Sequence, residues 1–300
     1  ETLAKEAPFG PVDDERAGHL WTARGAALEK LGRHDEARAA YERAGSRAGL
    51  LAVANAHLNA GRHDEAARVA RSLTEELSRS PERAAAWLTL GEACLASKQY
   101  AEGERAFLAA ADESDDAARS ARARLRAGWC RYLAGDPRAA RSLFEAAARG
   151  PLDERDAEEA SFLTARAAEA AGAGAEAGAL FERHVVGHPR GAHAVEACVR
   201  YARLAPDERS IPILEGLADS GATSEWIEIA GFDLAERLSA RGRHEDARRR
   251  YEAIVARGRD AELVTRARYG VAWSAYALHD LPGAARALEA LSGSGDLSPA

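Results

Sequence analysis

Small and large apolar residues recur along this 300-residue chain at fixed distances from one repeated turn. The turn has the sequence GRHDEA at 32–37 and at 61–66, and GRHEDA at 242–247. A glycine between two segments of helical periodicity typically ends a helix. Acidic residues directly after it suit the first turn of the next helix, where the helix dipole favours negative charge. The pattern therefore predicts two helices joined by a tight turn.

The same turn position can be followed through the whole chain at gaps of 29, 33 or 37 residues. The residues five positions after it and seven positions before it are small, and the residue nine positions after it is large and apolar in seven of eight cases. Small residues at one phase let two helices approach closely, and a large residue fills the remaining space. The sequence thus predicts one helical hairpin used eight times. The turn positions are Gly32, Gly61, Lys98, Gly135, Gly172, Ala205, Gly242 and His279.

Eight hairpins account for nearly the whole chain. No segment shows the two-residue alternation of a strand, so an all-α fold is expected. The ends, 1–15 and 293–300, carry Pro and Gly without helical periodicity and are expected to be flexible. The expected hairpins are 16–46, 47–79, 82–114, 117–149, 153–187, 190–219, 223–258 and 260–292.

Two hairpins carry a longer shared series of residues. The series is Trp21, Gly25, Gly32, Ala37, Tyr41 and Ala44 in the first, and Trp87, Gly91, Tyr100, Phe107 and Ala110 in the third, where Lys98 stands at the turn. It resembles the tetratricopeptide repeat (TPR) family, over about residues 17–292. The departures are the frequent 37-residue spacing, against the usual 34, and an irregular sixth hairpin with Pro206 and Pro212. The resemblance implies a right-handed α-solenoid of about eight hairpins, with the first helix of each lining a concave groove.

Composition and charge narrow the class of partner. A net charge of -7 and a sequence pI of about 5.8 argue against a general binder of nucleic acids or anionic membranes. No apolar run approaches the ~18 residues that span a bilayer. The abundant Ala and Arg, and hairpins around Trp129 and Trp273 that look like repeats of bacterial envelope-associated assembly proteins, suggest a bacterial source. We expect a soluble cytoplasmic or periplasmic protein and, since Met is absent, a processed protein or an excised fragment.

Motifs for catalysis, metals and cofactors find little support. The Gly-rich run 172–178 comes close to a dinucleotide fingerprint, but it has one residue too many and no strand before it. His184, His188 and His193 are close in sequence, yet an interleaved Gly and Pro should end the helix there. The three cysteines are far apart, which favours buried thiols over a disulfide framework or zinc site. We expect no enzyme activity, no catalytic residue, no metal and no cofactor.

One combination of residues recurs on the face expected to line the groove. An Arg, a Trp seven residues later and a Tyr three beyond it occur in the fourth and the eighth hairpin, 144 residues apart. Aromatic residues and Arg dominate binding hot spots, and paired Asn amides can hold a peptide backbone. The alternative is that the aromatics only fill gaps between helices. The predicted partner-binding residues are Asn55, Asn59, Arg122, Trp129, Tyr132, Phe162, Arg166, Phe232, Arg266, Tyr269, Trp273 and Tyr276.

These features favour a protein-protein interaction scaffold that binds a peptide or partner protein in a concave groove, within an envelope-associated bacterial assembly. The Lys, Asn and Arg with which the family clamps a peptide C-terminus are missing. The alternative is a regulatory or substrate-recruiting region of a larger enzyme or signalling protein. We expect no nucleic-acid partner and no direct insertion into a membrane.

Overall fold

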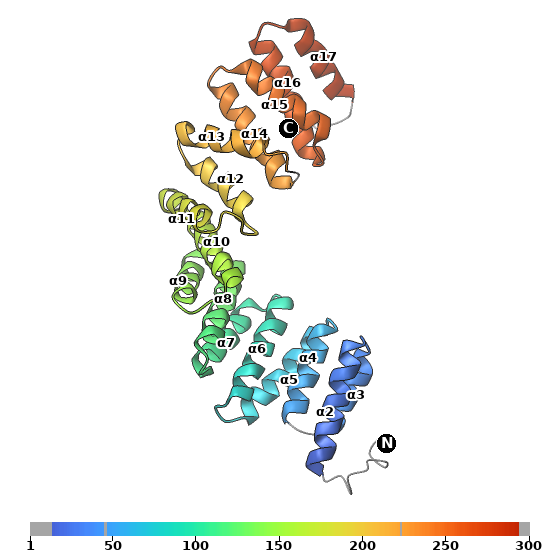
Figure 1. Ribbon diagram of the computed structural model, residues 1–300. Helices are drawn as coiled ribbons and strands as arrows, with labels where there is room; N and C mark the ends of the chain where they lie inside the picture. Colours follow the sequence, from blue (N-terminus) through green and yellow to red (C-terminus); the bar gives the residue numbers. More distant parts are fainter. Residues whose placement is uncertain (1–13, 45–46, 223, 294–300) are drawn as a thin grey trace. The chain divides into compact units, whose positions relative to one another are not determined.

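The computed structural model describes residues 14–44, 47–222 and 224–293, which form sixteen α-helices and no strand (Figure 1). The all-α class is therefore confirmed, and each hairpin begins and ends within four residues of its expected range. The ends expected to be flexible lie almost entirely outside the described residues. The helices are α2 (Asp14–Lys30), α3 (His34–Ala44), α4 (Arg47–Asn59), α5 (His63–Glu76), α6 (Pro81–Ala96), α7 (Tyr100–Glu113), α8 (Ala117–Leu133), α9 (Pro137–Ala148), α10 (Glu154–Ala170), α11 (Gly174–Gly187), α12 (Ala194–Leu204), α13 (Asp207–Ala218), α14 (Glu225–Ala240), α15 (His244–Arg257), α16 (Ala261–Ala277) and α17 (Leu281–Gly293).

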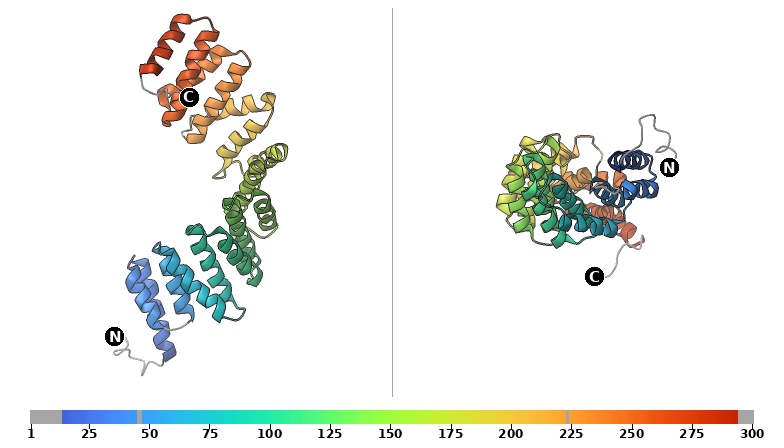
Figure 2. Two further views of the ribbon diagram at one scale, coloured as in Figure 1. Left: turned by 180° about the vertical axis from the view of Figure 1, so that it is seen from behind. Right: turned by 90° about the horizontal axis from the view of Figure 1, so that it is seen from below.

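The chain divides into two compact units, unit 1 at residues 1–171 and unit 2 at residues 172–300. Within each unit every helix packs against the next one in the chain, and the hairpins follow one another in chain order (Figure 2). The first helices of neighbouring hairpins also touch: α2 with α4, α4 with α6 and α8 with α10 in unit 1, and α12 with α14 and α14 with α16 in unit 2. We call the surface that these first helices share in each unit its first-helix face.

Left-handed backbone geometry marks the turns between helices. Five turn glycines have φ between 72° and 87°, and Lys98 and His279 take the same region at 60° and 61° without being glycine. The following residue then donates a hydrogen bond back into the helix, as when the Gln99 N–H reaches the Cys94 carbonyl at 2.8 Å. This arrangement satisfies carbonyls that a helix end would otherwise leave unpaired. It explains why the glycine at this position is the most regular sequence signal.

The sixth turn is built differently. Ala205 has extended backbone geometry, with φ -82° and ψ 152°, rather than the left-handed geometry of the other turn positions. The cause is Pro206, because a proline ring clashes with a helical conformation of the residue before it. Pro206 also stands immediately before α13, so the turn ends one helix and starts the next without a glycine.

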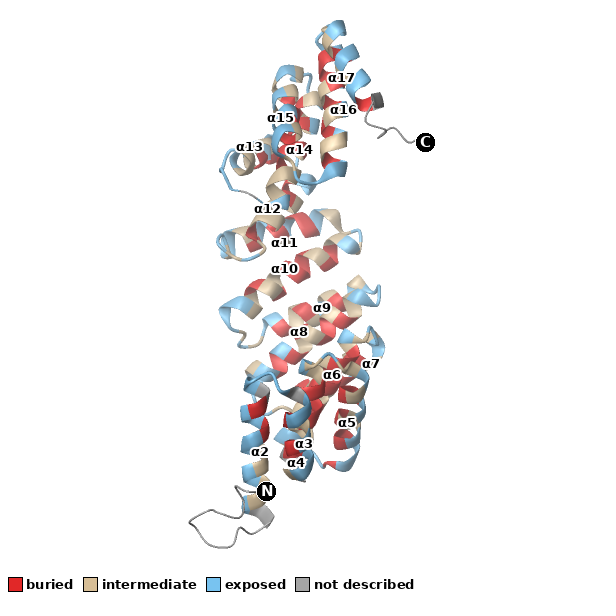
Figure 3. Ribbon diagram, turned by 90° about the vertical axis from the view of Figure 1, so that its right-hand side faces the viewer, coloured by how far each residue is buried: buried red, intermediate tan, exposed pale blue. Residues whose placement is uncertain are grey.

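Small residues let each hairpin close around a large one. Gly128 of α8 lies against the ring of Phe144 in α9, so closely that a Cβ at Gly128 would sit 2.6 Å from Cε1 of that ring. Phe144 is fully buried, as are Phe107 and Phe181 at the same phase of their hairpins, whereas Leu288 in the last hairpin is 47% exposed. Figure 3 shows the buried residues gathered where the helices face one another. The expected packing phase is thus the one the structure uses.

Two of the three cysteines are part of this packing. Cys94 and Cys130 are fully buried, and burial raises the pKa of Cys94 to about 11 and that of Cys130 to about 12. Cys198 is partly buried. Within the described ranges no cysteine is in a disulfide, and no helix combines the length and apolar character needed to cross a bilayer.

Candidate protein-interaction surfaces

Side-chain pairs connect neighbouring first helices of unit 1 at one repeated sequence distance of 34 residues. Most hairpins repeat after 37 residues, so each side chain meets a residue that lies about one helical turn earlier in the next hairpin. We call these the cross-helix pairs. They are Asn55 with Thr89, Glu92 with Arg126, Arg122 with Asp156, and Tyr132 with Arg166.

The predicted Arg-Trp-Tyr trio in unit 1 is tied into the fold. The rings of Trp129 and Tyr132 stack at 5.5 Å with only 5° between their planes, and both side chains are partly buried. The guanidinium of Arg166 lies 5.9 Å from the Tyr132 ring. Arg122 is engaged elsewhere, because it forms ion pairs with Asp156 and Asp153, which raise its pKa. This trio therefore offers a partner little free aromatic surface.

The matching trio of unit 2, Arg266, Trp273 and Tyr276, is exposed, and so is Tyr269 on the same helix. Tyr269, Trp273 and Tyr276 of α16 are 58%, 52% and 57% exposed. Their spacing of four and three residues places them on one side of the helix, and the rings of Trp273 and Tyr276 lie 5.8 Å apart. We call these three residues the aromatic stripe. Arg266 is one turn before it and lies 4.5 Å above the Phe232 ring, with no ion pair to any carboxylate in the described part of the chain.

Two predicted groove residues belong to the core instead. Phe162 is 2% exposed and Phe232 5% exposed, so neither ring faces a groove. Phe232 is covered by Arg266 from the next first helix and packs edge-on against Tyr251 at 5.7 Å. Tyr269 has the same phase in its hairpin but stays exposed. Burial at this phase depends on the neighbouring hairpin, which the local sequence does not reveal.

The two predicted asparagines lie four residues apart on α4. The side-chain oxygen of Asn55 accepts a hydrogen bond from the Thr89 hydroxyl at 2.9 Å, so part of its amide already serves the fold. Asn59 is exposed at the end of α4.

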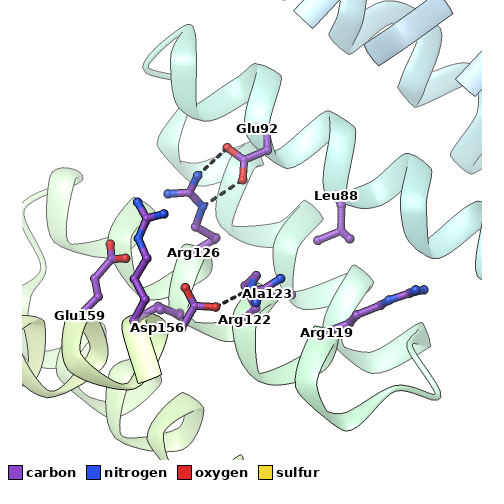
Figure 4. A pocket seen from close by; sticks show the side chains of 10 residues that line it. Leu88, Glu92, Arg119, Arg122, Ala123, Arg126, Asp156 and Glu159 are labelled. Atoms are coloured by element: carbon purple, nitrogen blue, oxygen red, sulfur yellow. Dashed lines mark hydrogen bonds and ion pairs between the residues drawn. The ribbon is translucent and has the colours of Figure 1, made fainter. Parts of the chain in front are cut away.

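A cavity on the first-helix face of unit 1 was not predicted. Its volume is about 460 Å³, and residues of α6, α8 and α10 line it (Figure 4). Arg122 alone among its lining residues was on the predicted list. Opposite charges 34 residues apart were the sequence signal that could have located it. The lining residues are Leu88, Glu92, Arg119, Arg122, Ala123, Leu125, Arg126, Arg155, Asp156 and Glu159.

The histidines noted in the sequence do not form a metal centre with other ligands. His184 is fully buried, and its ring lies 5.2 Å from that of His188 at a tilt of 38°. In the described residues there is no group of three or more His, Cys, Asp or Glu side chains arranged to hold a metal ion. The histidine rings therefore contribute to packing at the end of α11.

Solved structures with a similar arrangement of helices share little sequence with this chain. A tetratricopeptide repeat protein from Parabacteroides merdae is 11% identical with a TM-score of 0.54, covering 84% of this chain and 97% of that one. PilF from Pseudomonas aeruginosa is 16% identical with a TM-score of 0.52, covering 72% and 97%. The apo quorum sensor NprR from B. thuringiensis is 12% identical with a TM-score of 0.52, covering 84% and 76%. At such identities the likeness concerns the fold alone, and no curated protein matches the chain in sequence.

Sequence models of one family match most of the chain. One model described as a tetratricopeptide repeat matches residues 51–118, 125–192 and 232–299, and a second model of the same description matches residues 18–46. These matches cover well over half of the 300 residues and coincide with the helical hairpins. The chain belongs to the tetratricopeptide repeat family.

Proposed function

We propose that this protein-interaction repeat module binds a peptide or a partner protein on its first-helix faces. The observation that carries the proposal is the aromatic stripe, with its three half-exposed rings on one side of α16. Large aromatic side chains in water are unfavourable for the isolated protein. At interfaces the same residues provide most of the binding energy, at a low cost in side-chain entropy.

The guanidinium of Arg266, next to the aromatic stripe, gives this surface a hydrogen-bond donor with a fixed orientation. Arg266 is exposed and held over Phe232, and the described residues supply no carboxylate to pair with it. Stacking on a ring orients a guanidinium without neutralising its charge. A partner that places apolar side chains on Trp273 therefore also meets an oriented hydrogen-bond donor, Arg266, seven residues earlier on the same helix.

A displayed library of random twelve-residue peptides tests the proposal. Peptides are selected on the immobilised 300-residue chain and then measured by fluorescence anisotropy. Trp273→Ala should weaken the selected peptides by at least about tenfold, as truncation of a hot-spot aromatic does. Its melting temperature should stay close to that of the wild type, because about half of the Trp273 side chain is already in water.

Trp129→Ala is the matched control, because Trp129 has the same phase in its hairpin but is stacked on Tyr132. It should lower the melting temperature more than Trp273→Ala and affect peptide binding less. A library that yields no binding peptides would refute the proposal. Selected peptides that bind Trp273→Ala as tightly as the wild type would refute it as well.

A further inference from the structure

The cavity of unit 1 is held open by charge pairs that satisfy each other. In Figure 4 Glu92 points from α6 to Arg126 on α8, and Asp156 points from α10 to Arg122. The two Glu92 oxygens accept hydrogen bonds of 2.9 and 3.1 Å from Arg126. A two-point pair of this kind fixes the position of both groups as well as neutralising them. These pairs join three consecutive first helices, so the walls of the cavity are already ordered before a ligand binds.

Two further guanidiniums line the cavity without a strong partner. Arg155 is exposed, and nowhere in residues 14–44, 47–222 or 224–293 is a carboxylate found within ion-pair distance of it. Among the described residues Arg119 forms an ion pair with Asp116 alone, at 3.4 Å, and the two side chains are 69% and 50% exposed. A pair so exposed contributes little stability, so it competes weakly with a ligand. Both arginines can therefore turn to an incoming anion.

One carboxylate stands against these two positive charges. Glu159 lines the cavity four residues after Arg155 on α10, and no ion pair joins it to another described residue. The residues that line the cavity comprise four arginines and three carboxylates, which gives the lining itself a formal charge of +1. The local balance is positive, whereas the whole chain carries -7. An anionic ligand fits the excess charge of the cavity.

Apolar side chains complete the lining. Leu88, Ala123 and Leu125 contribute to it from α6 and α8. Ala123 and Leu125 are almost fully buried, so Leu88 provides the accessible apolar surface. Seven of the ten lining residues are charged, so charge dominates recognition at this site and the apolar contact is a smaller addition. The ligand must therefore present an apolar group and an anionic group close together.

We infer that the cavity binds an acidic side chain of a partner peptide, with a neighbouring apolar side chain lying against Leu88. Arg155 is the principal hydrogen-bond donor to the carboxylate of the peptide, and Arg119 is a second donor. Glu159 repels any further negative charge on the peptide. The inference rests on the proposed function in requiring a peptide partner, but it uses residues of unit 1 and none of the aromatic stripe. The group that binds is an acidic side chain within the peptide, so the charge of a peptide terminus is not required.

Capped synthetic peptides test the charge directly. The probe is a fluorescent peptide of sequence Gly-Ser-Leu-Glu-Leu-Ser-Gly, acetylated and amidated so that neither terminus is charged. Anisotropy titrations with the 300-residue chain compare it with a peptide that carries Gln in place of its acidic residue. The acidic peptide should bind at least about fivefold more tightly, since a hydrogen bond to a charged group is worth more than a neutral one. Its binding should weaken as salt is added, because salt screens exposed charges.

Variants of the chain then locate the site. Arg155→Gln should weaken the acidic peptide about five- to tenfold, and Glu159→Gln should tighten it about two- to threefold by removing a like charge. Arg138→Gln is the matched control, since Arg138 is exposed on the second helix α9 and does not line the cavity. It should leave the affinity within a factor of two. Opposite effects of Arg155→Gln and Glu159→Gln cannot come from a general loss of folding.

Several outcomes would overturn the inference. They are no binding of the acidic peptide, equal binding of the Gln peptide, equal effects of Arg155→Gln and Arg138→Gln, or weaker binding after Glu159→Gln, which would assign a cationic ligand to the cavity. Binding only by an uncapped peptide would assign a terminal carboxylate and also overturn it. Trp273→Ala should bind the acidic peptide like the wild type. If the acidic peptide fails these tests while the library peptides still depend on Trp273, the inference is wrong and the proposed function stands.

Discussion

Adding one methyl group at Gly128 should destabilise the protein, although alanine is the better helix former. A Cβ at this position would lie 2.6 and 2.7 Å from two atoms of the Phe144 ring and 3.2 Å from the Leu143 Cβ. Carbon atoms prefer separations of about 3.5–4.0 Å, so the fully buried ring has to move by about 1 Å. Overpacking of this kind costs roughly 1–3 kcal/mol, and the helix propensity of Ala returns about 1 kcal/mol. The net loss for Gly128→Ala should be about 1 kcal/mol.

Gly231→Ala provides the matched control. Gly231 is also buried within a helix, α14, but a Cβ there would find its nearest neighbour, the Ile254 Cδ1, at 3.9 Å. No ring has to move, so the propensity term remains and stability should rise by about 0.5–1 kcal/mol. The two substitutions are chemically identical and should have opposite signs.

Urea unfolding followed by circular dichroism at 222 nm, the helical band, measures both effects. Midpoints are the appropriate quantity, because neighbouring repeats need not unfold as a single two-state system. Gly128→Ala should lower the midpoint and Gly231→Ala should raise it. In a Phe144→Leu background, Gly128→Ala should lose its penalty, since the ring it strikes is gone. A rise in the midpoint for Gly128→Ala in the wild-type background would refute the idea that Gly128 and Phe144 are in rigid contact.

Three further predictions concern turns, charges and thiols. Lys98→Gly should stabilise the protein and Gly135→Ala should destabilise it, each by about 1 kcal/mol, because both positions need left-handed backbone geometry. The urea midpoint should therefore rise for the first variant and fall for the second, and equal signs would contradict this. Hydrogen bonds from Arg237 and Arg241 hold the pKa of Asp207 below its ordinary value near 3.8, so the stability that it provides is present above that value and disappears as pH falls through its lower folded pKa. The melting temperature of Asp207→Asn should therefore lie below the wild type at pH 6 and converge with it near pH 2, and a constant difference over that range would rule out this linkage. The two fully buried thiols should react with a chromogenic disulfide reagent at pH 8 only after denaturation, because their pKa values of about 11 and 12 keep them protonated; fast labelling of the native protein would contradict their burial.

The helices and turns could be predicted because their signals are local. A turn with left-handed backbone geometry favours glycine, and a helix with one buried side carries its small residues at a fixed phase. The signal failed at Ala205, where the small residue matches the pattern but Pro206 imposes a different turn. Lys98 and His279 show the reverse, since both make the expected turn without the expected glycine.

The candidate site could be predicted only in part, because exposure depends on neighbouring hairpins. The Arg-Trp-Tyr trio occurs twice, yet Arg122 pairs with Asp156 of α10 and with Asp153, which caps that helix, while Arg266 lies over a phenylalanine of the preceding first helix. Phe232 and Tyr269 have the same phase and opposite exposure. The sequence of a single hairpin therefore shows which residue types are present, but it does not show which residues of other hairpins they contact. The cavity was missed for the same reason, as its lining comes from three hairpins.

The cross-helix pairs also have a consequence for how the chain assembles. Repeats built to one pattern risk stacking on the wrong neighbour, since their apolar faces are nearly interchangeable. In unit 1 the pairs differ in chemistry from one junction to the next: amide with hydroxyl between α4 and α6, glutamate with arginine between α6 and α8, and both arginine with aspartate and phenol with guanidinium between α8 and α10. A hairpin docked out of order would leave Glu92 or Asp156 without a cation and place like charges together. These pairs therefore favour the correct order of the repeats over incorrect ones, even though each adds little to the stability of the folded protein.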